Sequence, residues 1–271
     1  MSKVVKSVEL PTGITLNYAE QGSSEGIPVI LLHGLSDSWH SFELILPKLP
    51  ESVRALVLTQ RGHGGSSRPE SDYWFKDYSD DVEAFLNTLK IDKAVVVGHS
   101  LGASNALKFA IDQAGRLSGL VLISAFANLP ESETPHALWE AVSDMSDPVN
   151  PGFIREFQES TLGRPISDAF FQTILSESKK LPARVWRAAV KCNLEDEDLL
   201  QKAHKVQAPT LLVRGGKDEL VSQKDAEALK GKIPNTRLLV HEDVGHAVHW
   251  EDPDRLAEEL KSFLETEVSG C

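Results

Sequence analysis

Residues 94–110, AVVVGHSLGASNALKFA, decide the fold of this chain. Its first four residues are small or β-branched and show no helical period, which predicts a buried strand. Apolar residues recur at helical spacing after Gly102, so a sharp turn joins this strand directly to a helix. Ser100 lies at the bend, and Gly98 and Gly102 are small enough to let strand and helix approach each other. We therefore expect an exposed Ser100 hydroxyl, with the first amides of the helix aimed at whatever it attacks.

The context of this serine matters more than the bare G-x-S-x-G pattern. From ordinary amino-acid frequencies, that pattern should occur by chance in roughly one chain of this length in ten. The apolar strand before it and the helix after it are what a nucleophile turn requires. The alternative interpretation is a glycine-flanked serine that only caps the helix.

Composition narrows the class of protein. The 271 residues are enough for one domain with a large core, with or without an insertion. A formal net charge of -12 argues against nucleic acid or an anionic membrane surface as a partner. Cys192 and Cys271 are too few for a disulfide framework and lack metal-site spacing. With no apolar leader and no membrane-length apolar run, we expect a cytoplasmic monomer or homodimer that acts on a small molecule.

Strands alternate with helices along most of the chain, which predicts an α/β fold with a mostly parallel eight-stranded sheet covered on both faces. The first two strands are expected to form an antiparallel hairpin at a sheet edge. Strands are predicted at 4–9, 14–19, 29–32, 55–58, 94–97, 120–123, 210–213 and 238–240. Besides the helix after Ser100, helices are predicted at 39–49, 78–89, 223–229 and 254–264.

Residues 125–209 interrupt the alternation with helical patterns and no convincing strand. We interpret them as a helical cap on a core made of residues 1–124 and 210–271. The cap is rich in aromatic residues, most of which would simply pack it on the core. Some should face the serine, because a cap over a catalytic turn needs an apolar underside. The expected substrate contacts are Trp39, Phe126, Trp139, Phe157 and Trp186.

A serine hydroxyl needs a base to become nucleophilic at neutral pH, and the chain has nine histidines. His246 is the strongest candidate, because it follows the last strand at the sheet edge where Ser100 is expected. His249, three residues later, is the nearest alternative.

An acid that orients the base is expected after the penultimate strand, in Arg214-Gly-Gly-Lys-Asp-Glu219. Asp218 follows a glycine pair that lets the loop fold back, and it gives the order Ser, Asp, His that is typical of this fold. Glu219 is the local alternative. Asp225, in the next helix, is better explained as a charge near a helix N-terminus.

These motifs together resemble the α/β-hydrolase superfamily, in its capped branch of esterases, lactonases and perhydrolases. The similarity runs from about Thr15 to Leu264. It rests on His33-Gly34, Arg61-Gly-His-Gly-Gly-Ser66, Gly98-His-Ser-Leu-Gly102, Gly215 to Asp218, and Gly245-His246. The resemblance implies Ser100 as nucleophile, His246 as base and Asp218 as orienting acid. It also implies an oxyanion hole formed by the amides of Leu35 and Leu101. One departure is Thr59, where relatives commonly carry an aspartate.

The expected activity is hydrolysis of a carboxylic ester or lactone of a small to medium apolar substrate, through an acyl-enzyme and without a metal or organic cofactor. Carbon–carbon bond hydrolysis, perhydrolysis and amide cleavage use the same three residues and stay open. A ligand receptor built on this scaffold is the alternative outside catalysis. Dehalogenases and epoxide hydrolases of this fold would use an aspartate nucleophile, whereas position 100 is serine.

Overall fold

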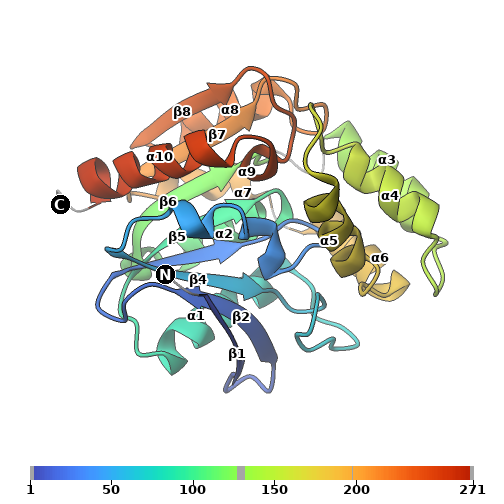
Figure 1. Ribbon diagram of the computed structural model, residues 1–271, viewed down its shortest axis with the longest axis horizontal. Coiled ribbons are helices and arrows are strands. Elements are labelled where there is room, and N and C mark those ends of the chain that lie inside the picture. The colour runs from blue at the N-terminus through green and yellow to red at the C-terminus, as the bar shows by residue number, and fades with distance from the viewer. Residues whose placement is uncertain (1–2, 127–131, 197, 269–271) are drawn as a thin grey trace.

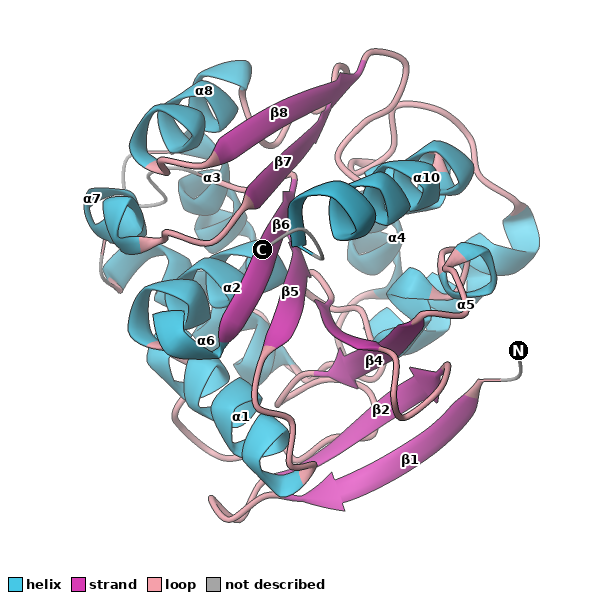
Figure 2. Cartoon of the chain, turned by 90° about the vertical axis from the view of Figure 1, so that its left-hand side faces the viewer, coloured by secondary structure: helices cyan, strands magenta, loops and turns pink. Residues whose placement is uncertain are grey.

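An eight-stranded sheet forms the centre of the protein in a computed structural model that describes residues 3–126, 132–196 and 198–268 (Figures 1 and 2). The strand order is β1-β2-β4-β3-β5-β6-β7-β8. The pairs β1 with β2 and β2 with β4 are antiparallel, and every pairing from β4 to β8 is parallel. The predicted sheet, with its antiparallel hairpin at the edge, is therefore confirmed. The strands are β1 (Val4–Glu9), β2 (Thr15–Gln21), β3 (Ile27–Leu32), β4 (Val53–Thr59), β5 (Ala94–His99), β6 (Leu117–Ile123), β7 (Thr210–Gly215) and β8 (Thr236–His241).

Helices connect the strands and cover both faces of the sheet (Figure 2). The α-helices are α1 (Phe75–Thr88), α2 (Leu101–Asp112), α3 (Glu133–Val142), α4 (Pro151–Glu159), α5 (Asp168–Ser178), α6 (Ala183–Glu195), α7 (Leu199–Lys202), α8 (Gln223–Lys232), α9 (Val248–Glu251) and α10 (Pro253–Phe263). Shorter turns are η1 (Trp39–Phe42), η2 (Leu46–Lys48), η3 (Ala114–Arg116), η5 (Ala203–Lys205) and the π-helical η6 (Leu264–Val268).

The central strands are buried on both faces, which explains why their sequences are continuous apolar runs. In β3, Ile30 and Leu32 belong to a core shared with α1, α2 and α8. Val29 and Leu31 face the other way, into a core shared with η1, η2 and α10. Two apolar layers therefore hold the sheet in place and fix the strand ends from which the site is built.

The helix predicted at 39–49 is wrong. Two short 3-10 turns, η1 and η2, occupy this stretch instead. Pro47 lies inside η2, and proline provides no backbone N–H for a continuous α-helix. Phe42 and Leu46 are nevertheless fully buried against the sheet, so the apolar spacing correctly marked a buried face.

The side chain and the carbonyl group of Thr59 each accept a hydrogen bond. Its Oγ1 accepts a hydrogen bond from the Trp39 amide at 3.1 Å, at the start of η1. Its carbonyl oxygen accepts one from Ser66 Oγ at 2.6 Å. A threonine thus ties the end of β4 to the two loops beside it.

The segment in which the sequence predicts a cap forms α3 to α7 and η5, and no strand occurs among its described residues. Residues 127–131 and 197 of this segment, and Cys271, lie outside the described residues. Helices α3 to α6 gather beyond one end of the sheet (Figure 1). None of the described helices has both the length and the apolar character needed to cross a membrane.

Substitutions at Gly98 test the close approach of β5 and α2. A Cβ atom added there would lie 2.2 Å from the Gly102 carbonyl oxygen, which is backbone and has little freedom to move. We expect Gly98→Ala to lower the free energy of unfolding by about 1–3 kcal/mol, measured by urea denaturation. Gly115→Ala is the matched control, because nothing lies within 4 Å of its added Cβ. Equal stability of the two variants would contradict this account of the turn.

Candidate active site

Ser100 lies at a strained turn between β5 and α2. Its backbone angles are φ 52° and ψ −118°, which a residue with a side chain rarely adopts. The glycines around it permit this geometry: a Cβ on Gly102 would lie 2.3 Å from the Leu32 carbonyl oxygen of β3. The Ser100 carbonyl accepts a hydrogen bond from Ala103 N and so starts α2. The serine side chain is thereby left to line a cavity at the sheet edge.

Two backbone amides lie beside this serine. Leu101 is the first residue of α2, and Leu35 follows the His33-Gly34 turn after β3. Within the described part of the chain, neither amide donates a backbone hydrogen bond, and both residues line the cavity. A Cβ added to Gly34 would lie 3.4 Å from Ser100 Cβ, so this turn passes close to the serine. The arrangement offers two N–H donors for a developing negative charge.

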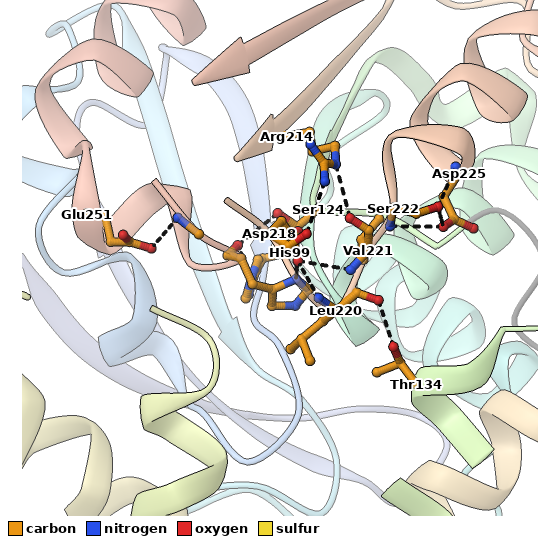
Figure 3. A network of polar contacts seen from close by, with 12 residues as sticks. His99, Ser124, Thr134, Arg214, Asp218, Leu220, Val221, Ser222, Asp225 and Glu251 are labelled. Atoms are coloured by element: carbon orange, nitrogen blue, oxygen red, sulfur yellow. Dashed lines mark hydrogen bonds and ion pairs between the residues drawn. The ribbon is translucent and has the colours of Figure 1, made fainter. Parts of the chain in front are cut away.

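His246 and Asp218 come together from the loops after β8 and β7. His246 Nδ1 lies 3.0 Å from Asp218 Oδ2 and 3.2 Å from Oδ1. Asp218 Oδ1 also accepts hydrogen bonds from the amides of Leu220 and Val221, both at 2.9 Å (Figure 3). Burial raises the pKa of the Asp218 carboxyl, but the charge on His246 and these hydrogen bonds outweigh it, so the net pKa is lowered. Asp218 is therefore a carboxylate that fixes the His246 ring.

The other ring nitrogen of His246 is left for the cavity, which both His246 and Ser100 line. Among the described contacts, the Ser100 hydroxyl makes no hydrogen bond to His246. Such bonds are often long before substrate binds and tighten in the complex. The geometry suits a serine, a base and an acid that act in sequence.

Backbone contacts hold the His246 loop against its neighbours. Ser124 Oγ donates to the His246 carbonyl oxygen at 2.8 Å, from the end of β6. The buried Glu251 carboxylate, labelled in Figure 3, accepts from Gly245 N at 2.9 Å and from Gly163 N, in the segment between α4 and α5, at 3.0 Å. A Cβ added to Gly245 would lie 2.3 Å from Gly163 N. The histidine loop and the α4–α5 segment are thus fastened to one another.

The alternative base and acids lie elsewhere. His249 is fully buried on α9, its Nε2 lies 2.9 Å from Ser41 Oγ, and it is not among the described residues that line the cavity. Burial, and then the charge on His246, lower the pKa of His249 to about 3. Glu219 is exposed to solvent. Asp225 caps α8 through Ser222 (Figure 3).

The cavity has a volume of about 310 Å³ and a mostly apolar lining. Of the aromatic residues predicted to contact substrate, Phe126 and Phe157 line it. Helix α3 contributes Leu138, Ala141 and neighbouring residues. A cavity of this size, mostly apolar with a few polar groups, is typical of a small-molecule site.

The structure does not bring Trp39, Trp139 and Trp186 to the cavity, since none is among the described residues that line it. Trp39 stacks on His40, with ring centroids 3.7 Å apart, on the opposite side of the sheet from the main core. Trp139 follows Leu138 on α3, and one residue turns about 100° around a helix, away from the cavity. Trp186 is 0% exposed and packs edge-on against Phe157, with ring centroids 5.0 Å apart. It supports a cavity residue and does not touch the cavity itself.

Sequence reasoning missed the polar wall of the cavity. Asp37, His99, Gln158, Asn193 and Trp250 all line it. Asp37 lies four residues after His33, in a stretch that suggested only a loop, and Gln158 is one polar residue within an amphipathic helix. Their shared location depends on how the cap is placed, so no local pattern could have revealed it. In the described part of the chain, no cluster of three or more His, Cys, Asp or Glu residues is arranged to hold a metal ion.

The chain is similar to known proteins over most of its length. Over 93% of this chain and 92% of the relative, the sequence is 27% identical to 2-(acetamidomethylene)succinate hydrolase of Mesorhizobium japonicum. It is 26% identical to Lipase 1 of Psychrobacter immobilis, over 96% of this chain and 83% of that protein. The solved structure of an esterase from Exiguobacterium antarcticum superimposes with a TM-score of 0.87 at 24% identity, over 97% of this chain and 100% of that one. Residues 27–253 match the family described as alpha/beta hydrolase fold, and this chain belongs to that family.

Proposed function

We propose that this protein is a serine hydrolase that cleaves carboxylic esters or lactones of small to medium apolar substrates. One observation carries the proposal. A single apolar cavity brings the Ser100 hydroxyl, His246 and the two amides of Leu35 and Leu101 to the same place. A molecule that only binds ligand has no chemical use for this combination.

The mechanism follows from the geometry. His246 takes the Ser100 proton as Oγ attacks the acyl carbon, and Asp218 stabilises the imidazolium that forms. The amides of Leu35 and Leu101 receive the developing oxyanion, and each such donor typically lowers the barrier by about 2.7–4 kcal/mol. The alcohol leaves with the proton from His246. Water, activated by His246, then attacks the acyl-enzyme, releases the acid and restores Ser100.

The cavity and the relatives favour ester cleavage over the other reactions that the same three residues could catalyse. The apolar lining suits an acyl or alkyl group and leaves the polar contacts to the reacting ester. Relatives and structural neighbours include proteins named as lipase and esterase.

Ser100→Ala and His246→Ala test the chemistry. We expect each to lower turnover of a short-chain 4-nitrophenyl ester by at least about 10⁴-fold, because the nucleophile or its base is lost. Asp218→Asn should cost about 10³- to 10⁴-fold, because the base loses its orientation and charge stabilisation. His204→Ala, at an exposed histidine on η5, is the matched control and should keep full activity. Activity near that of the wild type in Ser100→Ala or His246→Ala would disprove the assignment.

Phe157→Ala tests the substrate class. Removing this ring enlarges the cavity, so we expect the preferred acyl chain of a graded ester series to lengthen and kcat/KM for short acyl chains to fall. Phe153 packs in the same aromatic group at 5.4 Å from Trp186 but is not among the described cavity residues, which makes Phe153→Ala the control. A wild-type preference for charged or sugar-like esters over apolar esters of equal reactivity would refute the substrate proposal.

A further inference from the structure

A second buried acid faces the active-site cavity. Asp37 is 2% exposed and lines the cavity together with Ser100 and His246. It lies on the loop that also carries Leu35. Ser36 precedes it with φ 66°, a left-handed backbone that costs a non-glycine residue energy. The loop is thus held in a costly conformation directly beside this carboxyl group.

The described protein partners of this carboxyl group are one hydroxyl and one amide. Ser41 Oγ donates to Asp37 Oδ2 at 3.1 Å, and Gln158 Nε2 donates to Oδ1 at 3.3 Å. In the described part of the chain, no ion pair involves Asp37. The charged group that acts on it is Glu177 of α5, which has the same sign and is itself paired with Lys180. Among the described residues, Asp37 therefore has no cationic partner that would stabilise its charged form.

The contacts of the Ser41 hydroxyl with α9 favour donation of its own hydrogen to Asp37. His249 Nε2 on α9 lies 2.9 Å from Ser41 Oγ, and Trp250 Nε1 donates to the same oxygen at 3.2 Å. When the His249 proton is on Nε2, the Ser41 hydroxyl accepts it and its own hydrogen can point to Asp37. Trp250 Nε1 is shared with the Ser41 carbonyl oxygen at 2.9 Å, and the Gln158 amide also donates to Ser178 Oγ at 2.8 Å and to Ser36 Oγ at 3.0 Å. Among the described contacts of the Asp37 carboxyl group, none uses a hydrogen of its own.

Burial, and not these hydrogen bonds, decides the protonation state of Asp37. Burial raises the pKa of Asp37 to about 8, with Glu177 adding to the rise and the bonds from Ser41 and Gln158 opposing it. At neutral pH the group is therefore a neutral carboxylic acid, which has one O–H to donate. A buried acid held neutral in this way is a known means of placing a hydrogen-bond donor in an apolar site.

We propose that Asp37 is a specificity-determining residue that donates its carboxyl hydrogen to an ether or carbonyl oxygen of the substrate outside the reacting ester group. This inference rests on the proposed ester hydrolysis and adds a feature of its substrate. The enzyme would prefer esters in which one neutral acceptor oxygen interrupts an otherwise apolar chain. A negatively charged group at this position would meet repulsion once Asp37 ionises.

Stability provides a separate reason to assign a role to this residue. A carboxyl group that must stay protonated when folded, but ionises freely when unfolded, lowers the stability of the fold above the unfolded pKa. Asparagine would have nearly the same shape without this cost. A costly acid in the wall of an active-site cavity points to function.

The test uses pairs of 4-nitrophenyl esters. One member of each pair has a hydrocarbon acyl chain, and the other has an ether oxygen in place of one methylene of that chain. The position of the ether oxygen differs from pair to pair. The measured quantity is the ratio of kcat/KM for the ether to that for the hydrocarbon parent, each corrected for its rate of alkaline hydrolysis. We expect the wild type to prefer the ether at one position by about 5- to 10-fold, the effect of one hydrogen bond. Asp37→Leu should reduce the ratio to about 1. Asp37→Asn, which keeps an N–H donor, should retain most of it.

The pH dependence of this ratio separates hydrogen bonding from general damage to the site. Any change with pH that acts on the reacting ester group affects both esters of a pair equally and cancels in the ratio. In the wild type the ether preference should fall as pH rises through about 8, where Asp37 loses its proton. In Asp37→Asn it should not change with pH. Asp92→Asn, an exposed acid between α1 and β5, is the matched control and should behave as the wild type.

Defined outcomes would overturn the proposal. The proposal is wrong if the wild type shows no ether preference at any position, or if Asp37→Leu keeps the full preference. It is also wrong if the enzyme prefers an ammonium-bearing analogue more strongly, because that preference requires an ionised carboxylate. Failure of the proposed function looks different: the wild type would then hydrolyse neither member of any pair.

A folding measurement tests the neutral state of Asp37 without any substrate. The folded protein binds more protons at this site than the unfolded chain between pH 4 and 8, so wild-type stability should fall as pH rises through that window. In Asp37→Asn this part of the fall should vanish, and its urea midpoint should exceed that of the wild type at pH 8. Parallel stability curves for the two proteins would contradict a neutral Asp37.

Discussion

The close approach of β5 and α2 is the constraint on which the rest of the site depends. Strand and helix meet so tightly that a Cβ on Gly98 would lie 2.2 Å from the Gly102 carbonyl oxygen. The sharp turn that this close approach requires places Ser100 at φ 52°. Two apolar layers on the sheet hold that unfavourable backbone conformation. Because the backbone sets the direction of the hydroxyl, the rest of the site is arranged around a fixed point.

The parallel part of the sheet brings the remaining groups to that point. The carboxyl ends of neighbouring parallel strands meet at one edge, so the loops after β3, β5, β7 and β8 share a small volume. Each contributes a different chemical group: amides, the serine, the acid and the histidine. Glu251 then links Gly245 beside the histidine to Gly163 in the segment between α4 and α5. One carboxylate therefore holds both the histidine loop and that segment.

The buried charges of the site are few and specifically placed. His99 and His249 are neutral, because burial and the neighbouring histidines hold their pKa values low. Asp37 is neutral for the opposite reason, since burial raises its pKa to about 8. Asp218 alone combines burial with a lowered pKa, because His246 and two backbone amides stabilise its charge. Of the buried acids Asp37, Asp218 and Glu251, Asp218 is therefore the one whose charged form is stabilised, beside His246.

Local patterns in the sequence were enough to predict the sheet, the turn at Ser100 and the loops that carry Asp218 and His246. Apolar period and glycine placement are local properties, and parallel strands then bring distant loops to one edge. Which aromatic residues face the cavity could not be predicted in this way, because Leu138 and Trp139 differ by one step around a helix and the packing of that helix selects between them. It also decided the environment of Asp37. A carboxyl group's burial and its distance from positive charge depend on residues far away in the chain, here Gln158 and Glu177, whose positions no local pattern specifies.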